Sequence, residues 1–255
     1  MITSTKNPVV KLARRVASGR EPGLLLAEGS HLVAEALAAG VEIEHSLVCD
    51  HDLAGELRAR ARQHDDCSAE VLARASSLTT SPGVLAICRI PQWSADDLFR
   101  GTHPFVVFAA GVRDPGNLGS LVRTAEAAGA SGFVALSGSA DPFRDKAVRG
   151  SAGSVFRLPC WSGIGADGLQ RLTEATGMRL IALDSRDGES LWDADFGPHP
   201  HGFVLGSEAS GLPDDVRGQC GTLVRITTQP TVESLNVAVA AGVVLFEHRR
   251  RIAAT

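Results

Sequence analysis

The segment Phe203–Glu247 reads FVLGSEASGLPDDVRGQCGTLVRITTQPTVESLNVAVAAGVVLFE and decides the fold that we predict for this chain. Two apolar runs, 203–205 and 223–226, each stop at small and polar residues, which is typical of buried strands that end in loops. Glycines open and close the first loop, Gly206–Gly211, so its backbone can approach a ligand closely. The second loop, 227–234, leads into a helix of small residues. Because ligands of open α/β sheets bind at the carboxyl ends of the strands, we predict that the two loops form a binding cleft.

The composition indicates a globular protein. With 255 residues, 44% of them hydrophobic, the chain is long enough for one large or two modest domains. No apolar stretch approaches the roughly 20 residues of a membrane span, and the N-terminus lacks an apolar core with a cleavage site, so we expect a cytoplasmic protein. The five cysteines are scattered, which favours reduced thiols over disulfides or zinc. The net charge of −4 argues against a uniformly basic surface but leaves local basic patches open.

The pattern divides the chain into two α/β domains. Residues 1–91 alternate short apolar runs with helical ones, which predicts a small α/β unit. Residues 92–102 are polar and lack an apolar period, as expected of a linker. A second domain, 103–255, opens with the continuous apolar run 104–110, which is typical of a buried strand in a parallel sheet.

Two segments concentrate positive charge. The opening helix carries Lys6, Lys11, Arg14, Arg15 and Arg20. This cluster is either a solvated face or a surface that contacts phosphates. A long loop at 137–153 is rich in Gly and Ser and carries three cations, Arg144, Lys146 and Arg149. Cations beside glycines suit a phosphate backbone that approaches main-chain N–H groups, although an ordinary mobile loop is the alternative.

One arginine and two histidines give weaker signals. A helix is predicted from Leu118 to Ala128, and on it Arg123 lies roughly 150° from the centre of the apolar stripe, so its position alone indicates a solvated side chain. His199 and His201 lie between prolines with no further His or Cys nearby, which favours a surface turn over a metal site.

The motif Gly163–Gly168 offers a different function. It matches the G-x-G-x-x-G pattern of dinucleotide-binding proteins and precedes a predicted helix. However, Pro159 makes the preceding segment a poor strand, because proline cannot donate to a ladder. Asp184 also falls short of the offset of about 20 residues at which a ribose-binding acid is expected. We therefore interpret these glycines as a loop and helix entry, with an NAD-dependent oxidoreductase as the alternative.

Three segments of the second domain together resemble the SpoU (TrmH) family of RNA ribose 2′-O-methyltransferases, part of the SPOUT superfamily. They are Asn117–Ala125, Phe203–Leu212 and Glu233–Gly242. The stretch Lys146–Gly153 is similar to a loop of the same family. In the first domain, the short segments 4–8, 27–29 and 81–86 resemble the substrate-binding domain that often precedes the catalytic one, akin to a ribosomal RNA-binding protein fold. The resemblance implies a parallel C-terminal sheet whose chain is tied in a trefoil knot.

The resemblance also implies a reaction and a cofactor. It implies transfer of a methyl group from S-adenosylmethionine to a ribose 2′-hydroxyl of structured RNA, with rRNA favoured over tRNA and no metal. Arg123 would fix a substrate phosphate and stabilise the emerging alkoxide, beside the cofactor cleft. The residues that would hold this arrangement are Asn117, Glu208, Ser234 and Asn236. The residues that would bind the cofactor are Leu205, Gly206, Ser207, Glu208, Gly211, Ile226, Thr228, Ser234 and Leu235.

The RNA-contacting residues would be Lys11, Arg14, Arg15, Arg144, Lys146 and Arg149. The resemblance further implies a homodimer through the C-terminal domain, for which the face Ala238, Ala241, Gly242 and Leu245 suits either dimer packing or internal burial. One departure concerns Thr227–Pro230, which stands where many relatives have Pro-Met before a glycine. Because Pro230 lacks an N–H, a non-catalytic RNA-binding module is a further alternative.

Overall fold

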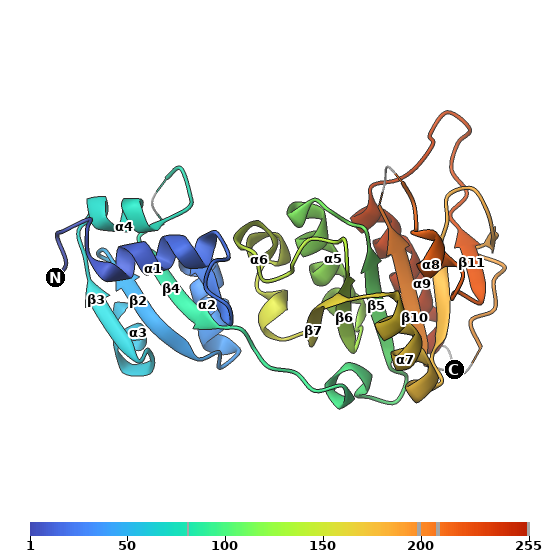
Figure 1. Cartoon of the computed structure of the whole chain (residues 1–255), viewed down its shortest axis with the longest axis horizontal. Helices are drawn as coiled ribbons and strands as arrows, with labels where there is room; N and C mark the ends of the chain where they lie inside the picture. The colour runs from blue at the N-terminus through green and yellow to red at the C-terminus, as the bar shows by residue number, and fades with distance from the viewer. Residues whose placement is uncertain (81, 198–199, 208–209, 254–255) are drawn as a thin grey trace. The chain divides into compact units, whose positions relative to one another are not determined.

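The computed structural model describes residues 1–80, 82–197, 200–207 and 210–253, which form two compact units (Figure 1). The first unit comprises Met1–Gln92 and Phe143–Arg157, and the second comprises Trp93–Pro142 and Leu158–Thr255. The segment Phe143–Arg157 thus joins the first unit, although the sequence pattern assigns it to the second domain.

The first unit is built on a four-stranded mixed sheet in the order β1-β4-β2-β3. β4 is antiparallel to β1 and β2, whereas β3 is parallel to β2. The strands are β1 Leu24–Glu28, β2 Ile43–Val48, β3 Gln63–Asp66 and β4 Val84–Arg89. The helices are α1 Pro8–Ala17, α2 Ser30–Ala38, α3 Ala54–Arg60, α4 Ala69–Ala75, α6 Asp145–Ser151 and the short 3₁₀ turn η2 Ser154–Phe156.

The first residues of α1 explain its start and its orientation. The Asn7 side chain accepts a hydrogen bond from the Val9 N–H at 3.0 Å, and Pro8 occupies the first helical position, where its missing N–H costs nothing. The apolar side of α1, including Val10 and Ala13, packs with α4 on one face of the sheet. The helices α2 and α3 lie on the other face (Figure 1).

The second unit contains a seven-stranded sheet in the order β7-β6-β5-β10-β8-β11-β9, in which every neighbouring pair is parallel. The predicted α/β class with a parallel C-terminal sheet is therefore confirmed. The strands are β5 Phe105–Ala110, β6 Gly132–Leu136, β7 Cys160–Ile164, β8 Arg179–Leu183, β9 Glu189–Ser190, β10 His201–Gly206 and β11 Thr222–Arg225. The helices are η1 Asp96–Phe99, α5 Pro115–Ala128, α7 Ala166–Thr176, α8 Asp214–Arg217 and α9 Val237–Ala253.

The centre of the sheet is the core of this unit. All six residues of β5 are buried, and β5 pairs in register with β10, where Val107 faces Phe203. Continuous apolar strands of this kind need helices on both faces. The helices α5 and α9 pack against each other, and α5 ends at Gly129, whose φ of +87° gives the left-handed cap that its sequence predicts. None of the described helices has the length and apolar character needed to cross a lipid bilayer.

Three local predictions were wrong. The segment 137–153 is not a continuous loop, because α6 forms within it and buries Ala147 and Val148. A strand does follow Pro159, since β7 begins at the next residue and lies at the edge of the sheet, where the proline disrupts no ladder. His201 is not in a surface turn but is buried in β10, and its neighbour His199 lies outside the described residues.

His201 belongs to a buried ring cluster between β10 and α9. The His248 ring centroid lies 4.8 Å from that of Phe203, 4.9 Å from that of Phe105 and 5.1 Å from that of His201. Burial lowers the pKa of His248 to about 3, and the neighbouring charges of His201, Arg251 and His103 act in the same direction. The folded protein therefore keeps this imidazole neutral at physiological pH.

We expect His248 to make the protein less stable in acid. Below about pH 6.5 the unfolded chain binds a proton at this residue that the folded chain does not bind. The free energy of unfolding should then fall by up to about 1.4 kcal/mol per pH unit between pH 6.5 and 3, and should be unaffected by this group at higher pH. Urea unfolding at several pH values, compared with that of His248→Leu, measures the effect. Equal pH dependence in the two proteins would contradict it.

Candidate functional site

A cavity of about 380 Å³ lies at the carboxyl ends of β8, β10 and β11. This size falls within the range of roughly 300–1,000 Å³ that is usual for small-molecule sites. Three strand-end segments, 183–187, 205–212 and 226–235, supply most of the wall, and the start of α9 closes it with Val237 and Ala240. The cavity thus lies where two loops were predicted to form a cleft.

The chain turns back on itself between Ser207 and Gly211, which pair with each other and both line the cavity. The Ser207 N–H donates to the Gly211 carbonyl at 3.0 Å, and the Gly211 N–H donates to the Ser207 carbonyl at 2.9 Å. Gly206 lies so close to this turn that an added Cβ would be 2.4 Å from the Gly211 carbonyl carbon. Glycine is therefore required at position 206 by the close approach of two backbone segments.

An ion-pair cluster forms the opposite wall. The Asp184 carboxylate accepts hydrogen bonds from the N–H groups of Arg186 and Asp187, at 2.8 and 3.1 Å, and from Nε of Arg217 at 3.2 Å. Arg217 also donates to Asp187 at 2.8 Å. Burial opposes ionisation of Asp184, but these hydrogen bonds and the Arg217 charge hold its pKa below the usual value.

These charged residues were missed by the sequence analysis. Asp184 was considered only as an ill-placed ribose-binding acid, and Arg217 was not considered. The signal that could have found Asp184 is its position directly after β8, at the carboxyl edge of the parallel sheet. Arg217 carries no such signal, because its contact with Asp184 spans two other elements.

The third wall segment, 226–235, contains the departure from the family pattern. The Val232 N–H donates to the Gln229 carbonyl at 2.9 Å, which makes Pro230 the second residue of a β-turn, a position that proline favours. The Thr228 hydroxyl donates to the Val232 carbonyl at 3.1 Å and closes the same turn. The N–H that Pro230 lacks is therefore not needed for this turn, and Pro230 is not part of the cavity wall.

The predicted cofactor-binding residues lie together. Those that line this one cavity are Leu205, Gly206, Ser207, Gly211, Ile226, Thr228, Ser234 and Leu235. The remaining residue of that set, Glu208, lies outside the described part of the chain.

The two asparagines predicted for the catalytic arrangement meet at the edge of the cavity. The Asn236 side chain donates to Oδ1 of Asn117 at 3.1 Å, so the start of α5 is tied to the start of α9. Asn236 also accepts from the Ala238 N–H at 3.0 Å and thereby caps α9. Because Ser234 and Leu235 line the cavity, this pair lies just beyond its wall.

Arg123 is not brought to the cavity. It is exposed on α5 and is absent from the cavity wall as formed by the described residues. Six residues separate it from Asn117, which places it about 9 Å further along the helix and on a different side. The expected approach of this guanidinium to the cavity is therefore not seen within a single chain.

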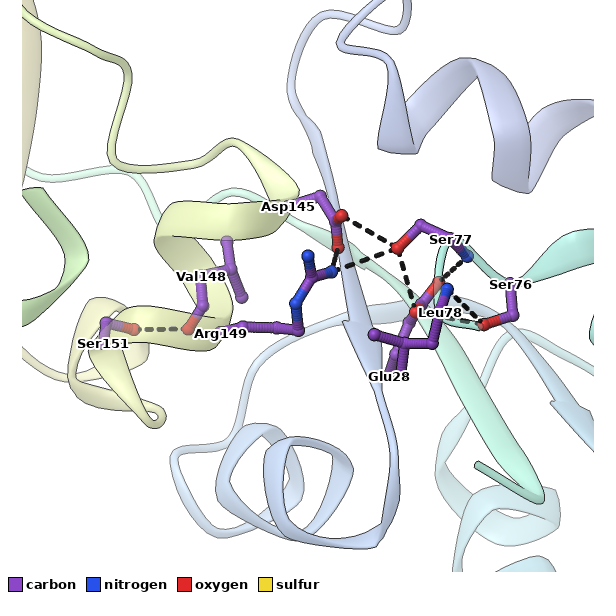
Figure 2. Close-up of polar contacts among 8 residues, drawn as sticks. All are labelled: Glu28, Ser76, Ser77, Leu78, Asp145, Val148, Arg149 and Ser151. Carbon is purple, nitrogen blue, oxygen red and sulfur yellow. Dashed lines mark hydrogen bonds and ion pairs between the residues drawn. The ribbon is translucent and has the colours of Figure 1, made fainter. Parts of the chain in front are cut away.

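The six predicted RNA-contacting residues all belong to the first unit. Lys11, Arg14 and Arg15 are exposed on α1, and Arg144 and Lys146 are exposed at the start of α6. Arg149 differs, because it is partly buried and forms an ion pair with Asp145 of the same helix (Figure 2). Across the described residues, no group of three or more His, Cys, Asp or Glu side chains is arranged to hold a metal ion.

Comparison with known proteins matches both parts of the chain to families. Residues 104–246 match the SpoU rRNA Methylase family, and residues 7–86 match the MRM3-like substrate binding domain. An uncharacterized tRNA/rRNA methyltransferase of Synechocystis sp. is 36% identical, over 98% of this chain and 93% of its own length. The 23S rRNA (guanosine(2553)-2′-O)-methyltransferase RlmP of Bacillus subtilis is 28% identical, over 97% of this chain and 98% of its own length.

Solved structures of rRNA and SpoU methyltransferases are also similar to this chain. The AdoMet-bound rRNA methyltransferase of Sinorhizobium meliloti is similar with a TM-score of 0.89 and 30% identity, covering 98% of this chain and 97% of that one. The SpoU methyltransferase AviRb of Streptomyces viridochromogenes, in complex with AdoMet, has a TM-score of 0.88 and 25% identity, covering 97% and 99%.

Proposed function

Because the chain belongs to the SpoU rRNA Methylase family, we propose that it transfers a methyl group from S-adenosylmethionine to a ribose 2′-hydroxyl of rRNA. The observation that carries the proposal is the cavity at the ends of β8, β10 and β11, whose wall unites the glycine-bounded turn with the segment before α9. Its size suits a nucleoside ligand, and relatives of the same fold are named as complexes with AdoMet. We propose that residues 103–255 carry out the transfer, that residues 1–91 bind the substrate, and that 92–102 links them.

The wall residues fit the cofactor. The absence of a side chain at Gly206 allows Gly206 to approach the Gly211 backbone closely, and both glycines line the cavity. The residues that would hold the cofactor are Leu205, Gly206, Ser207, Glu208, Gly211, Ile226, Thr228, Ser234 and Leu235. We add Asp184 and Arg217, whose ion pair fixes the segment 184–187 that forms the facing wall.

Methyl transfer requires that the reacting atoms be aligned and that the negative charge developing on the ribose oxygen be stabilised. S-adenosylmethionine supplies a methyl group that its sulfonium sulfur has already activated. The protein must place the ribose 2′-oxygen in line with that methyl and stabilise the negative charge that develops as the hydroxyl loses its proton. Arg123 cannot act as a base, because its guanidinium stays protonated, so it binds a phosphate of the RNA and stabilises this charge. Asn117 and Asn236 fix the orientation of α5 against α9, and Ser234 lies in the cavity wall. Glu208 is proposed to complete this set.

The RNA is proposed to be ribosomal. The N-terminal part matches a substrate-binding domain, and several relatives are named as 23S rRNA methyltransferases. The basic residues of the first unit supply phosphate contacts, which position RNA without reading its sequence. We therefore also propose that the protein acts in the cytoplasm.

Calorimetry tests the cofactor assignment. We expect S-adenosylmethionine to bind with a dissociation constant of roughly micromolar order and NAD to show no heat of binding, because the Gly163–Gly168 motif lies at the edge strand β7, away from the cavity. Binding of NAD instead would support the oxidoreductase. Binding of RNA with neither cofactor would support a non-catalytic module. Mapping of 2′-O-methyl groups on total RNA, with and without the protein, then identifies the modified nucleotide.

We also propose that two chains pair through α9. This helix exposes Val239 and Phe246, which are 55% and 48% accessible and lie two turns apart on the same face. Two residues of the small-residue face considered earlier, Ala241 and Leu245, are fully buried inside the unit. Internal packing therefore accounts for these two residues. The exposed apolar pair is a better candidate for contact with a second copy.

The pairing predicts a change of mass in solution. Light scattering should give twice the 26.7 kDa of one chain, and Phe246→Glu should shift the protein to the monomer, because a charge would be buried in the interface. Trp192→Glu is the matched control, since Trp192 is 56% exposed and lies outside α9. A wild-type monomer, or equal effects of the two substitutions, would argue against this interface.

A further inference from the structure

We propose that Arg144 and the exposed face of α1 form one surface that binds RNA phosphates, and that Ser77 and Glu28 are positioning residues that hold α6 in place for it. The inference rests on the proposed function, because it specifies how the RNA substrate is bound. Arg144 falls within the stretch that matches the methylase family, but it packs in the first unit.

Arg144 lies directly against the C-terminal end of α1. A Cβ atom added at Gly19 would fall 0.5 Å from Nη1 of Arg144 and 1.8 Å from its Cζ, so the guanidinium occupies the space that any side chain at position 19 would need. The φ of +69° at Gly19 also favours glycine. The last carbonyls of α1 carry the negative end of the helix dipole, which stabilises a cation placed there.

The exposed face of α1 continues this positive charge. Lys11, Arg14 and Arg15 are exposed and recur at the three- and four-residue spacing of one helix face. From Lys11 to Ala17, the last residue of α1, the helix rises about 9 Å, which corresponds to about three phosphates along one strand of a duplex. Residues 1–20 contain five cations and no Asp or Glu, and Glu21, just beyond them, forms an ion pair with Arg15. The segment therefore keeps a net positive charge toward a phosphate.

The helix α6 is held by hydrogen bonds that meet at Ser77. The Ser77 hydroxyl oxygen lies 2.8 Å from Oδ2 of Asp145 and accepts from Nη1 of Arg149 at 3.0 Å. On its other side, the Ser77 N–H donates to Oε1 of Glu28 at 2.9 Å, and its hydroxyl lies 3.1 Å from Oε2. Figure 2 shows the two charged side chains of α6 directed at Ser77, with Glu28 at the end of β1 beyond it.

The hydrogen bonds that hold α6 depend on the Ser77 hydroxyl, because the number of protons that can be shared between Ser77, Asp145 and Glu28 is limited. A hydroxyl has one proton to donate, yet two carboxylates contact the Ser77 oxygen. If Ser77 donates to Asp145, a protonated Glu28 can donate to Ser77 in turn. Burial of Glu28, which is 5% exposed, and the nearby Asp145 charge raise the pKa of its carboxyl, which favours that arrangement. Removing the hydroxyl leaves both carboxyl groups without this partner.

The C-terminal end of the segment Phe143–Arg157 is fixed on α2. Arg157 forms an ion pair with Glu35 of α2, and an added Cβ at Gly153 would lie 2.7 Å from the Glu35 side chain. Between these two ends, α6 packs along β1, which is an edge strand of the four-stranded sheet. A covered edge is protected from pairing with other chains. Attachment at both ends holds Arg144 beside α1.

The first experiment measures RNA binding by Arg144→Gln. Fluorescence anisotropy with a labelled RNA hairpin should show affinity reduced about tenfold, and the slope of log K against log salt should fall by about 1, as for loss of one phosphate contact. Arg60→Gln is the matched control, because Arg60 is an exposed arginine of the same unit whose side chain pairs with Glu56 on α3. Equal losses of RNA affinity in Arg144→Gln and Arg60→Gln would contradict the proposed RNA-binding surface.

The second experiment tests positioning. Ser77→Ala should reproduce part of the Arg144→Gln loss in both affinity and salt slope, and the double variant should bind no more weakly than Arg144→Gln alone. Ser76→Ala is the control, because the Ser76 hydroxyl donates to Glu28 at 3.2 Å and accepts from the Leu78 N–H, and among the described residues it makes no hydrogen bond to α6. Additive losses, or an equal loss in Ser76→Ala, would overturn the positioning role.

Cofactor calorimetry on the same proteins separates this inference from the proposed function. All five variants, the double variant included, should bind S-adenosylmethionine as the wild type does, because none of the substituted residues lines the cavity. A chain that binds RNA through Arg144 without binding the cofactor would refute the enzyme but not the surface. If Ser77→Ala does not fold, as judged by circular dichroism, the exposed Arg144→Gln variant still decides the surface.

Discussion

Replacing Arg123 by Ala should slow methyl transfer by about a hundredfold to a thousandfold, while the dissociation constant for S-adenosylmethionine changes by less than about twofold. The rate falls because a donor that stabilises developing negative charge is lost, and losses of this size are typical of such donors. Cofactor affinity is retained because the exposed guanidinium does not contribute to the cavity wall. Single-turnover methylation of unmodified rRNA and calorimetry measure the two quantities.

Two substitutions serve as controls for this result. Arg123→Lys keeps the charge but loses the planar fork that binds phosphate in two places, so only partial recovery is expected. Arg249→Ala removes another exposed arginine of the α5 and α9 pair, whose guanidinium donates to the Ala127 carbonyl at 2.9 Å, and should leave turnover nearly unchanged. Weakened cofactor binding with normal saturated turnover in Arg123→Ala would refute the assigned role.

The position of Arg123 raises the question of which cavity it serves. A mixture of Arg123→Ala chains with Gly206→Ala chains answers it, provided that the protein pairs as proposed. If Arg123 acts in the cavity of the second copy, each mixed pair contains one cavity with an intact turn and an intact arginine, and activity returns. If Arg123 acts in its own chain, both cavities of the mixed pair are defective and activity stays low.

The fold could be predicted to the extent that its strands are apolar. β5 is wholly buried and appears in the sequence as an uninterrupted apolar run, whereas the apolar run of β10 covers only Phe203–Leu205 and left the buried His201 out of the prediction. β3 could not be found in this way, because it reads Gln-His-Asp-Asp and lies at the edge of its sheet, where His64 and Asp65 hydrogen-bond to side chains of β2. β9 is two residues long and carries no period at all.

The residues of the site also differ in whether the sequence could predict them. The loop bounded by Gly206 and Gly211 could be predicted from the sequence, because a close backbone approach requires glycine, whereas the individual cofactor-binding residues came from the resemblance to a family. Contacts between side chains from distant elements were not visible. The Asp184–Arg217 pair, the Asn117–Asn236 hydrogen bond and the Gly19–Arg144 contact each depend on the tertiary arrangement of two segments. The resemblance to a family supplied Asn117 and Asn236, whereas nothing in the sequence supplied the other two contacts.

Replacing Gly206 by Ala should abolish binding of S-adenosylmethionine, with affinity reduced at least about a hundredfold. An added Cβ would lie 2.4 Å from the Gly211 carbonyl carbon, 2.6 Å from its oxygen and 2.7 Å from the Leu212 nitrogen. These are backbone atoms of the turn that forms the cavity wall, so the turn must move rather than a flexible side chain. Overpacking of this kind costs roughly 1–3 kcal/mol of stability, which the unit can lose and still fold.

The matched control for this substitution is Gly221→Ala. Gly221 lies just before β11 in the same unit, and an added Cβ there would meet no atom within 4 Å. Both variants lose the same backbone freedom in the unfolded chain, so a difference between them isolates the displaced turn. Calorimetry should therefore show cofactor binding by Gly221→Ala and none by Gly206→Ala, with circular dichroism confirming that both are folded. Wild-type affinity in a folded Gly206→Ala protein would show that the cofactor does not depend on this turn, and the cavity would then no longer support the proposed methyl transfer.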